Sequence, residues 1–415
     1  MAKQNKPAIR FKGFTDAWEQ RKLEDYLTVS AEKNTGNIYD RSDVLSVSGD
    51  YGIVNQIEFQ GRSFAGASVS NYGVVQTGDV VYTKSPLNSN PYGIIKTNKG
   101  KTGIVSTLYA VYHPKGNAFS DFIQVYFEQH ARMNNYMHPL VNKGAKNDMK
   151  VSAENALKGP VCFPSRIEQE SISTFFSVLD NLITLHQRKY DKLQVLKKAM
   201  LEKMFPKNGC SVPEIRFKGF TDAWEQRKLG EVVERITRKN ENLESTLPLT
   251  ISAQYGLIDQ NEFFDKRIAS KDVSGYFLVR NGEFAYNKST SSDAPWGAIK
   301  RLDRYESGVL STLYIVFKIL DERKTSSDYI VTYYNTDLWH KGIQAIAAEG
   351  ARNHGLLNVA PADFFETNLT MPKDYAEQQQ IGSFFQMLDH LITLHQRELE
   401  KLQNIKKSML EKMFV

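Results

Sequence analysis

The sequence predicts an α+β chain in which two β-rich domains are separated by two long helices that form an antiparallel coiled coil, with a pseudo-two-fold internal repeat. Three observations lead to this prediction. The chain repeats its own flanking segments at an interval of about half its length. The segments between the flanks are rich in alternating β-branched and aromatic residues, and each half closes with a long run of helical periodicity.

Length and composition limit the class of protein. A chain of 415 residues has room for two or three domains, and 41% hydrophobic with 24% charged residues is typical of a globular protein. The net charge of +6 permits a polyanionic partner without requiring one. Cys162 and Cys210 form no metal-binding or disulfide pattern. Because no signal segment or long apolar run occurs, we expect a cytoplasmic protein without membrane contact.

The internal repeat sets the domain organisation. Residues 7–23 and 213–229 are identical at 16 of 17 positions, and residues 175–205 match residues 384–414 at 22 of 31. Between these flanks, residues 46–85 match residues 250–289 at only 15 of 40 positions. Similar flanks around divergent middles predict a common scaffold that carries two domains with different targets. A recent duplication with uneven drift would produce the same gradient.

The first flank is expected to start a helix after Gly13. Asp16 can cap this helix and Glu19 follows three residues later, and the same pair recurs as Asp222 and Glu225. The middles are expected to be β-rich.

Two hairpins are expected within the middles. Residues 74–82 read VVQTGDVVY, and the corresponding residues 278–286 carry Asn281-Gly282 at the turn, which is a strong hairpin signal.

The long helices follow a Pro and a Glu-Gln pair in each half. We expect a first domain with its flank at residues 1–164, a first helix at 165–208, a second domain at 209–372 and a second helix at 373–415. Apolar residues on each helix alternate spacings of four and three, as in a coiled-coil seam. The expected seam residues are Phe176, Leu179, Ile183, His186, Leu193, Phe385, Leu388, Ile392, His395 and Leu402. The two histidines lack neighbours for a metal or catalytic role, so we expect them to be structural.

This arrangement suits a two-part site on duplex DNA. Because the second domain lies between the helices, the helices can pair antiparallel and relate two similar domains by an approximate two-fold axis. Two such domains held at a fixed separation match two half-sites on DNA. The alternative is a tandem-domain coiled-coil scaffold that binds protein partners without specific DNA recognition.

Two repeated motifs supply candidate DNA contacts. The motif Tyr-x-Lys-Ser offers a cation for phosphate and a hydroxyl for hydrogen bonding, although a solvated strand end would look the same. The motif Gly-Ala-Lys/Arg-Asn places a basic residue and an amide in a loop, where phosphate contact is expected and base readout or a loop-fixing role stays open. The candidates are Tyr82, Lys84, Ser85, Lys146, Asn147, Tyr286, Lys288, Ser289, Arg352 and Asn353.

A third motif is identical in the two halves. Residues 106–109 and 311–314 both read STLY. Identity in two domains with different targets argues against a specificity role, so a core strand is expected, with a shared backbone contact as a further possibility.

No catalytic constellation is found. An adenine methyltransferase needs a glycine-rich cofactor turn and an Asn/Asp-Pro-Pro-aromatic motif, and the sequence contains neither. Residues 100–102 read GKT, but position 95 is Ile95 where a phosphate-binding loop requires glycine. We therefore expect no enzyme activity, no metal and no cofactor bound by this chain.

The order of flank, β-rich domain, Pro-x-x-x-x-Glu-Gln entry and long helix resembles the specificity (S) subunit of type I restriction-modification systems. The resemblance covers essentially the whole chain and is carried by WEQRKLGE at residues 224–231 and by the helical segments 168–205 and 377–414. The first copy departs from KLGE, with Lys22-Leu23-Glu24-Asp25 in its place.

The resemblance implies a role and a set of partners. Two target recognition domains would each read one half of a bipartite, asymmetric site, and the helices would set the spacer. The partners would be double-stranded DNA, two methyltransferase (M) subunits and, in the full complex, restriction (R) subunits. S-adenosylmethionine, ATP and Mg would be used by those partners.

Overall fold

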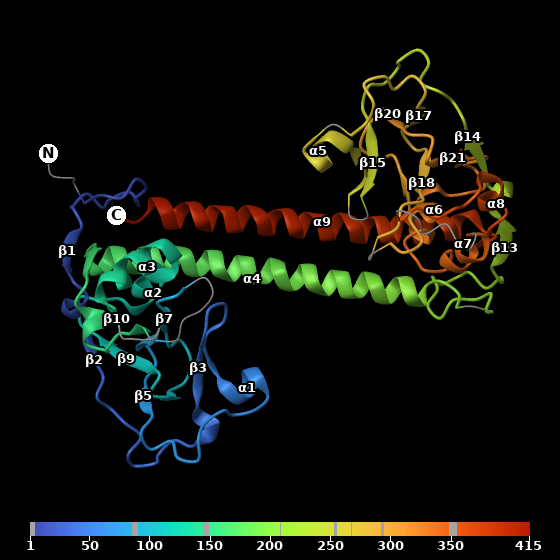
Figure 1. The fold of residues 1–415 in the computed structure, drawn as a ribbon. Coiled ribbons are helices and arrows are strands. Elements are labelled where there is room, and N and C mark those ends of the chain that lie inside the picture. Colours follow the sequence, from blue (N-terminus) through green and yellow to red (C-terminus); the bar gives the residue numbers. More distant parts are fainter. Residues whose placement is uncertain are drawn as a thin grey trace. The chain divides into compact units, whose positions relative to one another are not determined.

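The computed structural model divides the chain into two compact units that each combine helix and sheet. Unit 1 comprises Met1–Gln187 with Arg397–Val415, and unit 2 comprises Arg188–Gln396. Two long helices of 38 residues, α4 (Arg166–Lys203) and α9 (Tyr375–Lys412), each contribute one end to each unit (Figure 1). The described residues are 5–84, 90–143, 149–207, 209–252, 255–266, 268–291, 294–347 and 355–415.

Unit 1 is built on an antiparallel four-stranded sheet with smaller two-stranded sheets beside it. The four-stranded sheet has the order β2 (Leu27–Val29), β9 (Tyr109–Pro114), β6 (Val80–Thr83), β7 (Ile94–Thr97). The two-stranded sheets pair β1 (Glu19–Lys22) with β12 (Pro160–Phe163), β3 (Leu45–Ser48) with β4 (Gly52–Asn55), β5 (Gly73–Val75) with β8 (Gly103–Val105), and β10 (Asn142–Lys143) with β11 (Met149–Lys150). The shorter helices are α1 (Gln56–Gln60), α2 (Ser120–Glu128) and α3 (His130–Met137).

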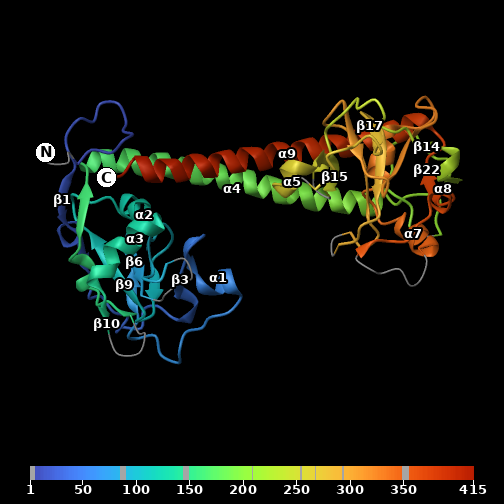
Figure 2. The same cartoon turned by 45° about the horizontal axis from the view of Figure 1, so that its top comes forward.

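Unit 2 repeats this plan and also combines strands with short helices (Figure 2). Its four-stranded sheet has the order β14 (Val233–Ile236), β21 (Ile315–Ile319), β18 (Phe284–Asn287), β19 (Ala298–Arg301). The pairs are β13 (Glu225–Lys228) with β22 (Asn368–Met371), β15 (Leu249–Ser252) with β16 (Gly256–Asp259), and β17 (Phe277–Arg280) with β20 (Ser307–Leu310). The helices are α5 (Gln260–Phe264), α6 (Ser327–Tyr333), α7 (His340–Ile346) and α8 (Pro361–Phe365). The repeat therefore extends through the divergent middles as a repeat of topology.

The predicted hairpins are wrong in their pairing, although each turn is present. β5 pairs with β8 while β6 pairs with β7 and β9, so the two strands around the first turn belong to different sheets. The Asp79 carboxylate accepts a hydrogen bond from the Gln76 backbone N–H at 2.7 Å, and the Gly78 N–H donates to the Asn98 carbonyl at 2.8 Å. The turn is therefore hydrogen-bonded to the segment that follows β7. It connects β5, in a two-stranded sheet, to β6, in the four-stranded sheet. Unit 2 repeats this arrangement at Gly282, which donates to the Leu302 carbonyl at 2.8 Å.

The predicted helix after Gly13 is also wrong. Glu19–Lys22 forms strand β1 and pairs with β12, the strand that leads directly into α4. Gly13 has a φ of +103°, and Gly219 at the same position of the second flank has a φ of +105°. This left-handed backbone suits glycine, because a side chain there would be strained, and it forms a turn before the strand. Each domain is therefore closed at its base by its first and last strands.

An aromatic core joins each domain to both long helices. In unit 1, Phe122 of α2 lies 5.7 Å from Phe414, and Phe176 of α4 lies 6.0 Å from Phe414, measured between ring centroids. In unit 2, Phe205 takes the place of Phe414 and lies 6.3 Å from Phe385 of α9. These ring pairs are tilted against each other. Such packing fixes the orientation of the domain on the helices and also buries apolar surface.

The end of each long helix is hydrogen-bonded to the flank of the same unit. The Ile9 N–H donates to the Lys412 carbonyl at 2.9 Å in unit 1, and the Ile215 N–H donates to the Lys203 carbonyl at 2.9 Å in unit 2. We call these two contacts the matched junctions. Both units therefore have the same contact between helix end and flank. In unit 2 the two partners are close in sequence, whereas in unit 1 they come from two distant segments.

Candidate nucleic-acid interface

Each long helix begins at a buried ion pair with its flank. Arg10 Nε and Nη2 donate to the Glu168 carboxylate at 2.6 and 2.7 Å, and Arg216 makes the same two bonds to Glu377 at 2.6 and 2.7 Å. Both carboxylates are only 1% exposed. The side-chain hydrogen bonds to these carboxylates raise the pKa of Arg10 and Arg216. A two-pronged arginine contact fixes direction as well as distance, which explains why the flanks are nearly identical.

The glutamine after each glutamate binds the domain backbone. Gln169 accepts from the Phe119 N–H at 2.9 Å and donates to the Asn117 carbonyl at 3.1 Å. Gln378 accepts from the Ser326 N–H at 2.9 Å in unit 2. Both glutamines are fully buried, so these bonds satisfy polar groups at the start of α2 and α6. The Glu-Gln pair is therefore an anchor between helix and domain.

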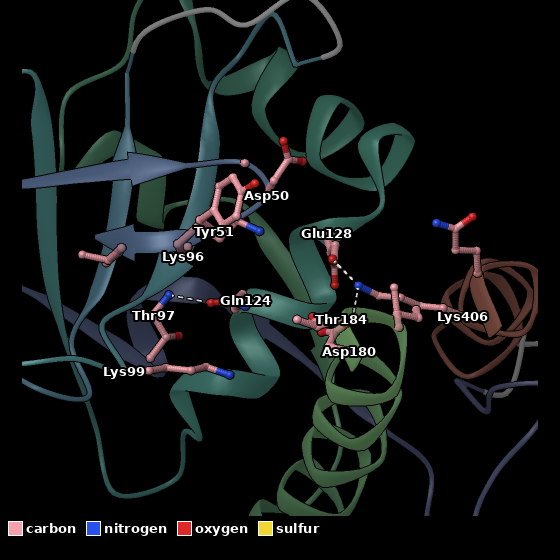
Figure 3. A pocket seen from close by; sticks show the side chains of 15 residues that line it. Asp50, Tyr51, Lys96, Thr97, Lys99, Gln124, Glu128, Asp180, Thr184 and Lys406 are labelled. Carbon is pink, nitrogen blue, oxygen red and sulfur yellow. Dashed lines mark hydrogen bonds and ion pairs between the residues drawn. The ribbon is translucent and has the colours of Figure 1, made fainter. Parts of the chain in front are cut away.

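A second set of ion pairs lies farther along the helices. Figure 3 shows Lys406 of α9 between Glu128 of α2 and Asp180 of α4, at 2.6 and 2.7 Å. Burial alone would lower the pKa of Lys406, but the two carboxylates raise it above its ordinary value. In unit 2 the equivalent pair joins Lys197 to Asp389 at 2.5 Å. These bonds hold both helices to each other and to the domain within a unit.

A cleft of about 450 Å³ lies in unit 1 between the β3–β4 turn and the helices. Lys96 lines it, is only 9% exposed, and has its pKa lowered by burial (Figure 3). Glu128 Oε2, in the same cleft, has no hydrogen-bond partner within the described part of the chain. Because carboxylates and amines are mixed here, the cleft does not favour a polyanion. Across the described ranges no group of acidic, histidine or cysteine side chains could hold a metal ion.

The prediction that Tyr82 and Tyr286 contact DNA is corrected by their burial. The two side chains are 1% and 0% exposed, and their hydroxyls donate to the carbonyls of Tyr92 and Trp296 at 2.7 and 2.9 Å. Burial raises the pKa of Tyr82 to about 12 and raises that of Tyr286 further. Both rings are core residues that position the strand ends after them.

The lysines that follow these tyrosines lie at the surface. Lys84 and Lys288 are partly exposed at the ends of β6 and β18, and Ser289 is exposed. Burial lowers the pKa of Lys288, and none of the described carboxylates pairs with this lysine. A partly buried cation without a counterion favours an anionic ligand such as phosphate.

The structure describes neighbours of the remaining candidates but not the candidates themselves. Ser85, Lys146, Asn147, Arg352 and Asn353 lie outside the described residues. In unit 2 the Thr290 N–H donates to the Gly355 carbonyl at 2.7 Å and the Leu357 N–H donates to the Lys288 carbonyl at 2.9 Å. The structure thus brings Gly355 and Leu357 beside Thr290 and Lys288, which follow β18.

The STLY motif is a turn and not the predicted core strand. Tyr109 N–H donates to the Ser106 carbonyl at 3.1 Å, and Tyr314 N–H donates to the Ser311 carbonyl at 3.2 Å. Leu108 and Leu313 at the tips are 62% and 56% exposed. The motif therefore belongs to the surface of each domain.

The seam residues occupy the least exposed face of both helices. Phe176, Leu179, Phe385 and Leu388 are buried. The other six, Ile183, His186, Leu193, Ile392, His395 and Leu402, are partly buried. Leu193 joins the core of unit 2 and Leu402 joins that of unit 1.

The comparisons with known proteins concern the fold. No protein-family model matches the chain, and no curated protein matches it either. Among solved structures, a chain described under the assembly and conformational transition of the type I R-M system covers 96% of this chain and 97% of its own, at 13% identity and a TM-score of 0.43. The alignment with an HsdS subunit from Thermoanaerobacter tengcongensis covers 96% of this chain and 96% of that subunit, at 13% identity and a TM-score of 0.43.

A third structure gives a higher score over the whole length. The type I restriction-modification system S subunit from M. genitalium covers 99% of both chains at 11% identity, with a TM-score of 0.60. In the part of the chain that the structure describes, no helix is long and apolar enough to span a membrane. The chain has the fold of a type I restriction-modification S subunit.

Proposed function

We propose that this chain is a non-catalytic DNA sequence-recognition subunit of a type I restriction-modification complex. One observation carries the proposal: two units share one topology and the same helix anchors, while their middle segments differ in sequence. A pair of readers for two different half-sites needs this combination. The fold shared with an S subunit over 99% of both chains supports the same conclusion.

Each unit would read one half of a bipartite, asymmetric site, with target recognition domains at residues 1–164 and 209–372. The helices at 165–208 and 373–415 would form an antiparallel coiled coil that fixes the spacer. The seam residues support this pairing, as do the ion pairs Lys406–Asp180 and Lys197–Asp389, which join α4 to α9 within each unit.

The partners of the proposed subunit are double-stranded DNA, two methyltransferase subunits and the restriction subunits. The methyltransferase subunits would dock on the helices. S-adenosylmethionine, ATP and Mg would be bound by those subunits, and the chain itself would bring specificity. The DNA-facing surface would include Lys84 in unit 1 and Lys288 with Ser289 in unit 2.

The direct test is genome-wide adenine methylation in cells with and without this chain, with its methyltransferase present in both. We expect a two-part motif that is lost when the chain is removed. Replacing residues 24–160 with the same segment of another such protein should change one half of the motif only. Methylation that is indifferent to the chain would contradict the proposal and favour the protein-binding scaffold.

A further inference from the structure

The exposed leucines of the STLY turns have no role inside the fold. Leu108 and Leu313 stand at the same position of units 1 and 2, within four residues that are identical in both. More than half of each side chain is exposed, and neither belongs to a core cluster. Turn tips are usually polar because exposed apolar surface is unfavourable in water. An identical apolar tip in two divergent domains indicates a ligand that both domains share.

Each leucine precedes a strand whose partner strand is followed directly by a lysine. The Lys84 N–H donates to the Leu108 carbonyl at 3.3 Å. In unit 2, β18 pairs with β21 as far as Tyr286 opposite Ile315, and Lys288 and Leu313 each lie two residues beyond this last pair, on the same side of it. We call these pairs, Lys84 with Leu108 and Lys288 with Leu313, the Lys–Leu edges.

In unit 2 the surroundings of the edge favour an anion. Lys288 is partly buried, and no carboxylate of the described ranges is paired with it. The exposed Thr107 and Thr312 add a hydroxyl beside each leucine. An ammonium, a hydroxyl and a hydrocarbon side by side suit the phosphate, sugar and base edges along a DNA groove.

We propose that the Lys–Leu edges make the same sequence-independent contact with duplex DNA in both half-sites. The lysine binds a backbone phosphate, and the leucine packs into the adjacent minor groove against sugars and base edges. Because backbone and sugar are the same in every sequence, this contact can stay identical while the base-reading loops diverge. The inference rests on the proposed function and adds to it the element that positions the domain on DNA without reading bases.

The test uses the full chain with its methyltransferase subunits and measures binding to a target duplex and an unrelated duplex over a range of salt. In Leu108→Ala/Leu313→Ala we expect affinity for both duplexes to fall by about the same factor, on the order of tenfold or more. The methylated motif should not change. Ile38→Ala/Leu320→Ala, at exposed apolar positions away from the edges, should bind as the wild type does.

The lysines have a separate signature. In Lys84→Ala/Lys288→Ala the slope of log affinity against log salt should become shallower by about 1.8, since each lost phosphate contact removes about 0.9. A leucine variant that binds DNA normally but no longer assembles with the methyltransferase would overturn the inference and assign the edges to that protein. A changed motif would overturn it in favour of base reading. A wild-type complex that binds no DNA would instead overturn the proposed function.

Discussion

Arg216 carries much of the attachment of its domain to α9. Its guanidinium is 12% exposed and Glu377 is 1% exposed, so removing the arginine leaves a buried carboxylate without a counterion. We expect Arg216→Met to lower the free energy of unfolding by about 3–5 kcal/mol. A urea titration followed by circular dichroism measures this change.

The matched control is Arg227, whose partner Glu231 is 53% exposed. An exposed pair contributes less than about 1 kcal/mol, so Arg227→Met should be nearly neutral. Equal effects of the two variants would show that the Arg216–Glu377 pair is not the anchor described above.

Lys406 should make the stability of unit 1 depend on pH. Its pKa is raised by Glu128 and Asp180 against the opposing effect of burial. The stabilisation is therefore fully present below the unfolded pKa of about 10.4 and is lost as the pH rises through the folded value. The difference in unfolding free energy between the wild type and Lys406→Gln should shrink between neutral pH and strongly alkaline pH. A difference that is independent of pH would contradict this assignment.

Single residues were the hardest feature to predict from the sequence. Arg10 and Glu168 are 158 positions apart, and no local pattern joins them. A signal existed, because the same arginine and glutamate recur in the second copy as Arg216 and Glu377. Tyr82 was misjudged although strand alternation places it on the same face as the buried Val80.

At the scale of elements, Gly297 permits the close approach of β18 and β19. Its φ is +80°, and a Cβ there would lie 2.2 Å from the Asn287 carbonyl oxygen. We expect Gly297→Ala to destabilise unit 2 by at least about 2 kcal/mol, from backbone strain together with the clash. Thermal unfolding measures this effect. Because Asn287 precedes Lys288, DNA affinity should fall as well.

Gly275 provides the control for this substitution. No atom lies within 4 Å of the position that a Cβ would take there, and its φ is not in the left-handed region. Gly275→Ala should therefore leave the unfolding temperature and the DNA affinity nearly unchanged. If both alanine variants behave alike, close approach at Gly297 is not the cause.

Long elements could be predicted and strand pairing could not. The spacing of apolar residues predicts helices whose ends at Lys203 and Lys412 lie within a few residues of the expected limits. In contrast, Gly78-Asp79 and Asn281-Gly282 indicate turns without indicating which strands pair. Both strands at each turn are largely buried, so each could pair with several partners, and contacts distant in sequence decide.

At the scale of the whole molecule, unit 1 is assembled from two segments that are distant in the sequence, whereas unit 2 is contiguous. Unit 1 needs Lys406 and Phe414 from the far end of the sequence. A fragment of residues 1–208 lacks them, but it carries the equivalents Lys197, in α4, and Phe205, just after α4. Two copies of the fragment can therefore complete each other. We expect a dimer in analytical ultracentrifugation, and a folded monomer at micromolar concentration would contradict this expectation.

The repeat was the most informative feature of the sequence for the architecture, because it showed that one plan is used twice. The surface proposed to contact DNA was harder to predict from the sequence. A loop motif such as Gly-Ala-Arg-Asn indicates which groups could bind DNA, but it does not indicate where they lie in the fold. The structure joins Gly355 to Thr290 and Leu357 to Lys288 by backbone hydrogen bonds, while the motif itself lies outside the described residues.

The matched junctions bear on the ancestry of the gene. Eleven residues, 204–214, connect Lys203 to Ile215 in unit 2, whereas in unit 1 the matched contact joins Ile9 to Lys412, which are far apart in the sequence. A half-length ancestor could thus have worked as a homodimer on an inverted repeat, and tandem fusion would then have released its two copies to evolve toward unequal half-sites.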